Sequence, residues 1–197
     1  MENYICQLLL RYGHPAPRKP QQSPHQHHEI IYGARIQNPI EEYTFPPLDA
    51  SGIKHIQGIF STVLYHYRAV NKTFLTTISS IGSEQASAPQ ATTKAASHLL
   101  DYLATYPNYG ITYRSSNIIL AAHSDAAYLN ETCSRSRARL HIFYSYNDPI
   151  PRDNGPIMSL SQIINVVMSS ASEAELSGLF ITAKAMVPLR NTLKEMK

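Results

Sequence analysis

The sequence predicts an α+β protein in which a helical region precedes a small sheet and one further helix. Apolar residues recur at three- and four-residue spacing between residues 51 and 106, as they do on one face of a helix. After residue 110, short apolar runs are separated instead by turn-forming residues. These runs follow one another without a helical pattern between them, which predicts an antiparallel meander.

Composition places the chain among globular proteins. It has 197 residues, of which 43% are hydrophobic and 16% charged, with a net charge of +3. This mild charge permits a nucleic-acid partner but does not indicate one. Two cysteines are too few for a disulfide framework, so we expect a reducing intracellular compartment, cytoplasmic or nuclear. No apolar run has the length of a membrane span, and no membrane partner is expected.

Residues 1–50 are predicted to hold little regular structure. Residues 2–12 have the pattern of a short amphipathic helix. Residues 13–28 are rich in Pro, Gln and His, which favours a solvated extended linker. Histidines in this segment could bind a metal, but no spaced Cys or acidic residue follows them, so we favour the linker. Glu29–Tyr32 has the pattern of one short strand.

Residues 51–109 are predicted to form a layer of three helices. The first covers residues 51–70 and the second residues 74–86. The third begins after Pro89, which suits a first helical turn, and ends before Pro107. Their leucines and tyrosines are typical of an ordinary packed core, and no cofactor-binding pattern is present.

Residues 110–197 are predicted to form a sheet. Ile111–Arg114 alternates like a half-exposed strand, and Ile118–Ala122 is apolar enough for a strand buried on both faces. Leu140–Tyr146 and Ile157–Ile164 follow as further strands. The intervening loop carries three arginines and Cys133, which has no nearby His to act as a base and is therefore an improbable nucleophile.

The last helix begins with a capping box. Ser170 is the predicted N-cap, and Glu173 can reach back to its backbone N–H. Glu175 lies about 200° round the helix from Glu173, needs no cap, and is the functional candidate. Pro188 should kink or end the helix. The residues predicted to be buried are Leu176, Leu179, Phe180, Ala183 and Val187.

Two carboxylates are candidates for one acidic metal site. Asp125 follows the apolar strand, where a carboxylate is well placed to hold a divalent cation over a cleft. Glu175 is the second candidate ligand. His123 beside Asp125 invites a catalytic role, although a histidine at the end of a strand is more often a structural donor.

The order of several motifs resembles the C-terminal part of the polyprotein of copia-type LTR retrotransposons. This part comprises the end of reverse transcriptase, its connection and the start of ribonuclease H. The resemblance covers the whole chain, and no single motif is decisive. The motifs are Leu64-Tyr65-His66-Tyr67-Arg68-Ala69, Leu99 to Tyr102, Ser124-Asp125-Ala126, Ser134-Arg135-Ser136, and Ser169-Ser170 with Glu173-Ala174-Glu175.

The resemblance implies a ribonuclease H-like fold that cuts RNA in RNA–DNA hybrids with two Mg²⁺ ions held by four carboxylates. Asp125 matches the first carboxylate and Glu175 the second. Mn²⁺ could replace Mg²⁺. The third and fourth carboxylates are expected beyond Lys197, so we expect a truncated fold, weak metal binding and little activity. Arg139-Leu140 also stands where relatives carry a small glycine pair.

Two non-enzymatic alternatives remain open. One is a non-catalytic module in which Arg135, Arg137 and Arg139 contact the phosphates of an RNA–DNA hybrid or another nucleic acid. The other is a vestigial structural remnant with no partner, in which the arginines belong to a solvated loop. No small-molecule cofactor is expected in either case.

Overall fold

The structure is a computed structural model that describes residues 3–26, 46–86, 88–131 and 134–196. The chain divides into two compact units, Met1–Gly110 and Ile111–Lys197. The first unit is helical and the second holds a three-stranded antiparallel sheet and a helix, so the predicted α+β class is confirmed. Each unit is described below by itself.

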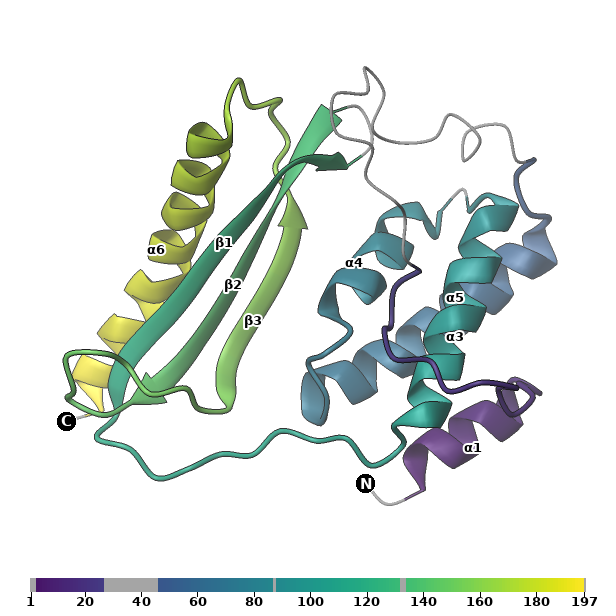
Figure 1. The fold of residues 1–197 in the computed structure, drawn as a ribbon, viewed down its shortest axis with the longest axis horizontal. Coiled ribbons are helices and arrows are strands. Elements are labelled where there is room, and N and C mark those ends of the chain that lie inside the picture. The colour runs from purple at the N-terminus through teal and green to yellow at the C-terminus, as the bar shows by residue number, and fades with distance from the viewer. Residues whose placement is uncertain (1–2, 27–45, 87, 132–133, 197) are drawn as a thin grey trace. The chain divides into compact units, whose positions relative to one another are not determined.

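The described residues of the first unit form four helices (Figure 1): α1 (Tyr4–Arg11), α3 (Ala50–Ala69), α4 (Leu75–Glu84) and α5 (Gln90–Thr105). Each lies within a residue or two of its predicted bounds. Asp49 caps α3 by accepting a hydrogen bond of 2.7 Å from the backbone N–H of Gly52. Because the predicted helices rested on strong three- and four-residue periodicity, their existence and order agree with the structure.

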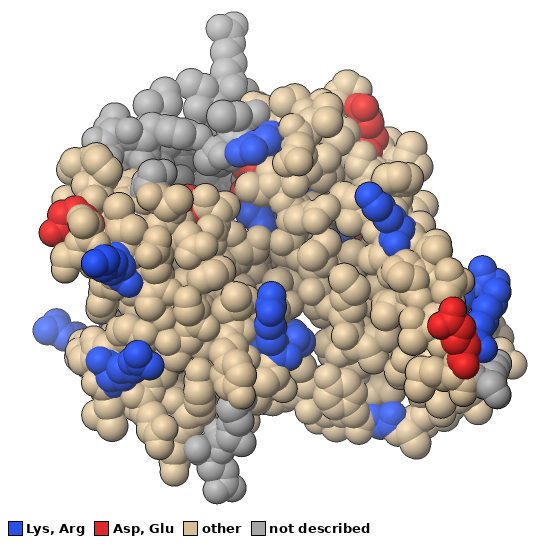
Figure 2. Space-filling view, turned by 180° about the vertical axis from the view of Figure 1, so that it is seen from behind, with Lys and Arg blue, Asp and Glu red and all other residues tan. Residues whose placement is uncertain are grey.

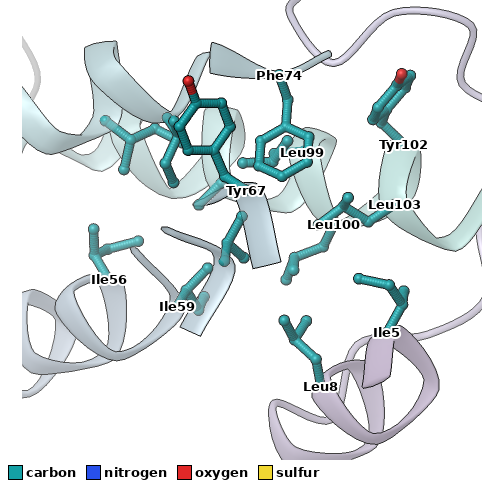
Figure 3. Packing of buried hydrophobic residues seen from close by; sticks show 14 residues of the cluster. Ile5, Leu8, Ile56, Ile59, Tyr67, Phe74, Leu99, Leu100, Tyr102 and Leu103 are labelled. Carbon is teal, nitrogen blue, oxygen red and sulfur yellow. The ribbon is translucent and has the colours of Figure 1, made fainter. Parts of the chain in front are cut away.

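The four helices share one hydrophobic core, whose packing Figure 3 shows in close view. Ile5 and Leu8 of α1 lie in it with only 2% exposure, beside residues of α3 and α5. Each such side chain contributes about 1.5–3 kcal/mol when it leaves water. The two predicted regions on either side of residue 50 therefore share a single core.

The described part of the proline-rich segment packs against α5. His14 Nε2 lies 2.8 Å from the carboxylate of Asp101, and Gln21 donates its backbone N–H to Thr105 Oγ at 3.0 Å. Most of residues 13–26 are exposed and without regular structure, as predicted. The segment is nevertheless not a free tether, because side chains of α5 bind it at these points. The predicted strand at Glu29–Tyr32 lies outside the described residues.

The second unit contains β1 (Ile119–Glu131), β2 (Arg135–Ser145), β3 (Pro156–Ile163) and α6 (Ala171–Glu195). The strands pair in the order β1-β2-β3, all antiparallel, as the meander predicted. Figure 1 shows α6 running along one face of this sheet. Ile111–Arg114 is extended but forms no strand, in contrast to the prediction.

Two further predictions about the sheet are wrong. β1 continues past Asp125 to Glu131, so Asp125 lies within the strand rather than at its end. Arg135, Arg137 and Arg139 belong to β2 rather than to a loop. The polar residues of both strands pair across the ladder, and this cross-strand pairing, which local apolar content does not reveal, extends the hairpin.

The face of α6 that packs on the sheet is not the predicted one. Its buried residues are the small Ala174, Gly178 and Thr182, whereas Leu176 is 66% and Phe180 67% exposed. Small residues let the helix backbone approach the sheet closely, and this outweighs the burial of larger side chains. Pro188 lies inside the helix, which continues to Glu195.

Candidate nucleic-acid interface and metal site

The two faces of the sheet differ in chemistry. Ser124 and Ala126 face α6, since a Cβ on Gly178 would lie 3.5 Å from Ser124 Oγ and 3.4 Å from the Cβ of Ala126. Because side chains alternate along a strand, His123 and Asp125 point to the opposite face. We call this the far face.

Asp125 lies on the far face opposite Arg139 of β2. Its carboxylate accepts a hydrogen bond of 3.4 Å from Arg139 Nη1, and the side chains are 63% and 39% exposed respectively. Arg139 Nε is buried without a hydrogen-bond partner. Such an exposed pair contributes at most about 1 kcal/mol. The Arg139 guanidinium is therefore only partly satisfied by Asp125.

Glu175 lies in the first turns of α6 and is exposed. The helix begins as predicted at Ser170, whose Oγ accepts a hydrogen bond of 3.1 Å from the Glu173 N–H. Glu173 reaches the hydroxyl and N–H of Ser169, each at 2.6 Å, rather than the N–H of Ser170. These hydrogen bonds from Ser169 lower the pKa of the Glu173 carboxyl. Glu173 is thus a capping residue, which leaves Glu175 free of that role.

The backbones of the two candidate ligands are neighbours, but their side chains are not on one side of the sheet. A Cβ on Gly178 would lie 3.3 Å from the carbonyl oxygen of Asp125, and Glu175 precedes Gly178 by one turn. The Asp125 carboxylate nevertheless points to the far face, away from α6. Within the described part of the chain, no group of three or more His, Cys, Asp and Glu side chains is placed to hold a metal. The carboxylates of Asp125 and Glu175 therefore do not converge on a position where both could bind one Mg²⁺ ion.

Arg137 has a structural role. It is fully buried, and its Nε and Nη2 donate to the two carboxylate oxygens of Glu131, the latter at 3.1 Å. Its Nη1 donates to Ser161 Oγ at 3.2 Å. A phosphate cannot reach this guanidinium, so the prediction that Arg137 contacts nucleic acid is wrong. Arg135 is half-buried at the start of β2, where it pairs with Glu131 in the ladder.

Two histidines join Asp125 and Arg139 on the far face. His123 Nε2 lies 2.7 Å from the carboxylate of Asp153, which agrees with its interpretation as a structural donor. The rings of His123 and His141 are stacked with centroids 6.5 Å apart. Sequence reasoning did not single out His141. The two-residue alternation that places Arg139 and His141 on one face of β2 was the signal that could have found it.

Basic side chains are dispersed on the face of the molecule that Figure 2 shows. In the view of Figure 2 the Lys and Arg side chains form separate groups with acidic residues among them, and they do not form one continuous patch. No helix in the described ranges has the length and apolar character needed to cross a membrane. Comparison with family models, with curated proteins and with solved structures finds no match to this chain.

Proposed function

We propose that the Ile111–Lys197 unit is related to the first half of a ribonuclease H-like domain of copia-type retrotransposons and binds RNA–DNA hybrids without cleaving them. The observation that carries this proposal is the three-stranded meander followed by a helix that crosses β1 at Asp125. This is the order of elements that the resemblance implies. Asp125 and Glu175 come from the two elements expected to supply the first two carboxylates.

Arg139 is the residue that we assign to hybrid binding. Its side chain is 39% exposed and its Nη1 contact with Asp125 is long, so the outer guanidinium nitrogens can reach a ligand, whereas the buried Nε cannot. A planar guanidinium with spare donors suits a phosphate oxygen. His123 Nε2 contacts the Asp153 carboxylate and His141 Nε2 the carbonyl oxygen of Asn154, so the two imidazoles can donate to a phosphate only through Nδ1 and only in the imidazolium form. The dispersed basic residues predict weak, salt-dependent binding rather than a high-affinity complex.

Binding without cleavage follows from the acidic residues. Two-ion hydrolysis of a phosphodiester requires carboxylates that converge on both ions. Asp125 instead faces Arg139 on the far face, and Glu175 belongs to the helix on the other side. These two residues therefore do not form such a centre in the arrangement described.

Fluorescence anisotropy with a labelled RNA–DNA hybrid tests the proposal. We expect Arg139→Ala to weaken binding about fivefold or more and to reduce the dependence of log K on log salt by about one. Arg137→Lys is unsuitable as a control because it perturbs a buried pair. Arg190→Ala, on the exposed C-terminal part of α6, is the matched control and should leave affinity unchanged. Equal affinities of wild type and Arg139→Ala would contradict the proposal.

Magnesium-dependent cleavage by Asp125 and Glu175 is the second candidate. It is favoured by the close backbone approach of Asp125 to α6 one turn from Glu175. Hydrolysis of the hybrid that requires Mg²⁺ or Mn²⁺ and is lost in both Asp125→Asn and Glu175→Gln would establish it.

A further inference from the structure

The outer edge of β1 is open within the described residues of the second unit. The strand order β1-β2-β3 makes β1 an outer strand, and an outer strand presents backbone N–H and C=O groups that can pair with another strand. A pocket of about 300 Å³ lies between α6 and the paired strands β1 and β2, and Ser145 of β2 and Pro151 of the following loop also line it. Its walls include Ala122 and Ser124 of β1 and Leu179, Ala183 and Met186 of α6.

We propose that a second copy of this chain occupies the edge, with the two β1 strands paired antiparallel about a two-fold axis at Ser124. The proposal does not rest on the hybrid-binding function, although both use His123 and Asp125 of the far face. From Ile119 to Ala127 the strand pairs regularly with β2, so its outer edge is regular over the same stretch. An axis at Ser124 pairs residue 121 of one copy with residue 127 of the other, which keeps the new ladder inside this stretch.

Charge complementarity on the far face favours this register. With the axis at Ser124, Asp125 lies opposite His123 of the second copy, and the pair occurs twice by symmetry. The Nδ1 atom of His123 is not used in the contact with Asp153, and in the imidazolium form, in which both ring nitrogens carry a proton, it can donate to the facing carboxylate. Cross-strand pairs of complementary groups stabilise a sheet by about 0.2–1 kcal/mol each, whereas like charges directly opposite destabilise it.

Neighbouring registers lack these pairs. An axis at Asp125 places two carboxylates directly opposite each other. An axis at His123 brings two imidazoles together and leaves Asp125 opposite the apolar Ala121. Among these three registers, the axis at Ser124 alone joins acidic groups to donors.

The face toward α6 supplies a second, independent observation. Ser124 Oγ is buried and has no hydrogen-bond partner. A buried hydroxyl without a partner costs about 1–3 kcal/mol. On the two-fold axis the two Ser124 side chains lie directly opposite, with Cβ atoms about 4.5–5.5 Å apart, and their hydroxyls can bond to each other. Ala122 then faces Ala126 of the second copy, a pair small enough to fit beneath the helices.

α6 contacts both β1 and β2 and therefore lies close to the β1 edge. Because the axis is perpendicular to the sheet, both copies of α6 lie on the same face of a continuous six-stranded sheet. Leu179, which is 56% exposed, would then lie on the same face of the sheet as its counterpart in the second copy.

Thiol cross-linking tests the register directly. In the full chain with Cys6→Ser and Cys133→Ser, we expect Ser124→Cys to give covalent dimers with a cross-linker that spans about 5 Å. Ala122→Cys alone is the control for random collision and should give none above background. Ala122→Cys combined with Ala126→Cys should restore cross-linking. Equal yields for Ser124→Cys and Ala122→Cys would overturn the proposed register.

Sedimentation tests the dimer without cysteines. We expect the full chain to form a concentration-dependent dimer. His123→Asp should weaken it at least tenfold, because the introduced carboxylate would face Asp125 of the second copy. His123→Asn loses the same imidazole without adding charge and should weaken it only about two- to fourfold. A chain that stays monomeric at about 100 μM, so that its Kd would be about millimolar or weaker, would overturn the proposal.

Discussion

The carbonyl oxygen of Asp125 lies against Gly178, so close that a Cβ on the glycine would stand 3.3 Å from it. This contact joins the middle of β1 to the second turn of α6. It explains why α6 buries its small residues, because larger side chains at Ala174 or Gly178 would hold the helix away from the strand. The contact between the Asp125 backbone and Gly178 therefore helps to set the positions of Asp125 and Glu175, the two carboxylates that the resemblance assigns to the metal site.

Substitution of Gly178 should show a steep dependence on size. Gly178→Ala gains about 1 kcal/mol of helix propensity, which offsets the tight contact, and we expect a change in stability of less than about 1 kcal/mol. Gly178→Leu must move α6 away from β1 and should cost about 2–4 kcal/mol. Thermal unfolding followed by circular dichroism measures both. A leucine as well tolerated as the alanine would show that the helix does not approach the strand closely.

The Glu131–Arg137 pair should be essential to the hairpin. Glu131→Ala leaves the fully buried Arg137 without its carboxylate, and we expect a loss of about 3–5 kcal/mol. Asp125→Ala removes the other carboxylate–arginine pair of this hairpin, which is exposed, and should cost less than about 1 kcal/mol. Chemical denaturation of the two variants gives the comparison. Similar losses in both would contradict the assignment of Arg137 as a buried structural residue.

His66 should make the stability of the helical unit depend on pH. It is 3% exposed and stacked between the rings of Tyr4 and Phe74, and burial lowers the pKa of its imidazole. The unfolded chain, with a His pKa near 6.5, therefore binds more protons than the folded chain below about pH 6.5. The stabilising contribution is present above this pH and decreases as the pH falls.

A variant separates His66 from the other histidines. His66→Phe keeps the ring stacking and removes the titratable group. We expect the midpoint of thermal unfolding to fall less between pH 7 and pH 5 in His66→Phe than in the wild type. An unchanged pH dependence would mean that His66 is not the group responsible.

The sequence predicted some elements well for identifiable reasons. The helices of the first unit carry long three- and four-residue patterns, and Ser170 is a local capping signal, so neither depends on distant residues. The order of the three strands followed from the absence of helical patterns between them. These features are local.

The features that the sequence did not predict depend on pairing across the fold. The extension of β1 past Asp125 rests on its ladder with Arg137 and Arg139, and the orientation of α6 rests on Gly178. The apolar residues Leu176 and Phe180 pointed to the wrong face of α6, because close backbone approach selected small residues instead. The sequence predicted a loop position for Arg137, whereas the structure pairs its guanidinium with the Glu131 carboxylate. The sequence therefore supplied candidate residues for the site, whereas the positions of their side chains depend on contacts that the sequence alone did not reveal.

Hybrid binding by Asp125→Asn and Glu175→Gln tests the central claim most directly. We predict that Asp125→Asn binds an RNA–DNA hybrid about two- to fivefold more tightly than the wild type, because it releases Arg139 and removes a negative charge. Glu175→Gln, on α6, should bind like the wild type, and none of the three proteins should cleave the hybrid. Weaker binding by Asp125→Asn would contradict the account. Mg²⁺-dependent cleavage by the wild type that is lost in both variants would also contradict it and would establish a metal site formed by the two carboxylates.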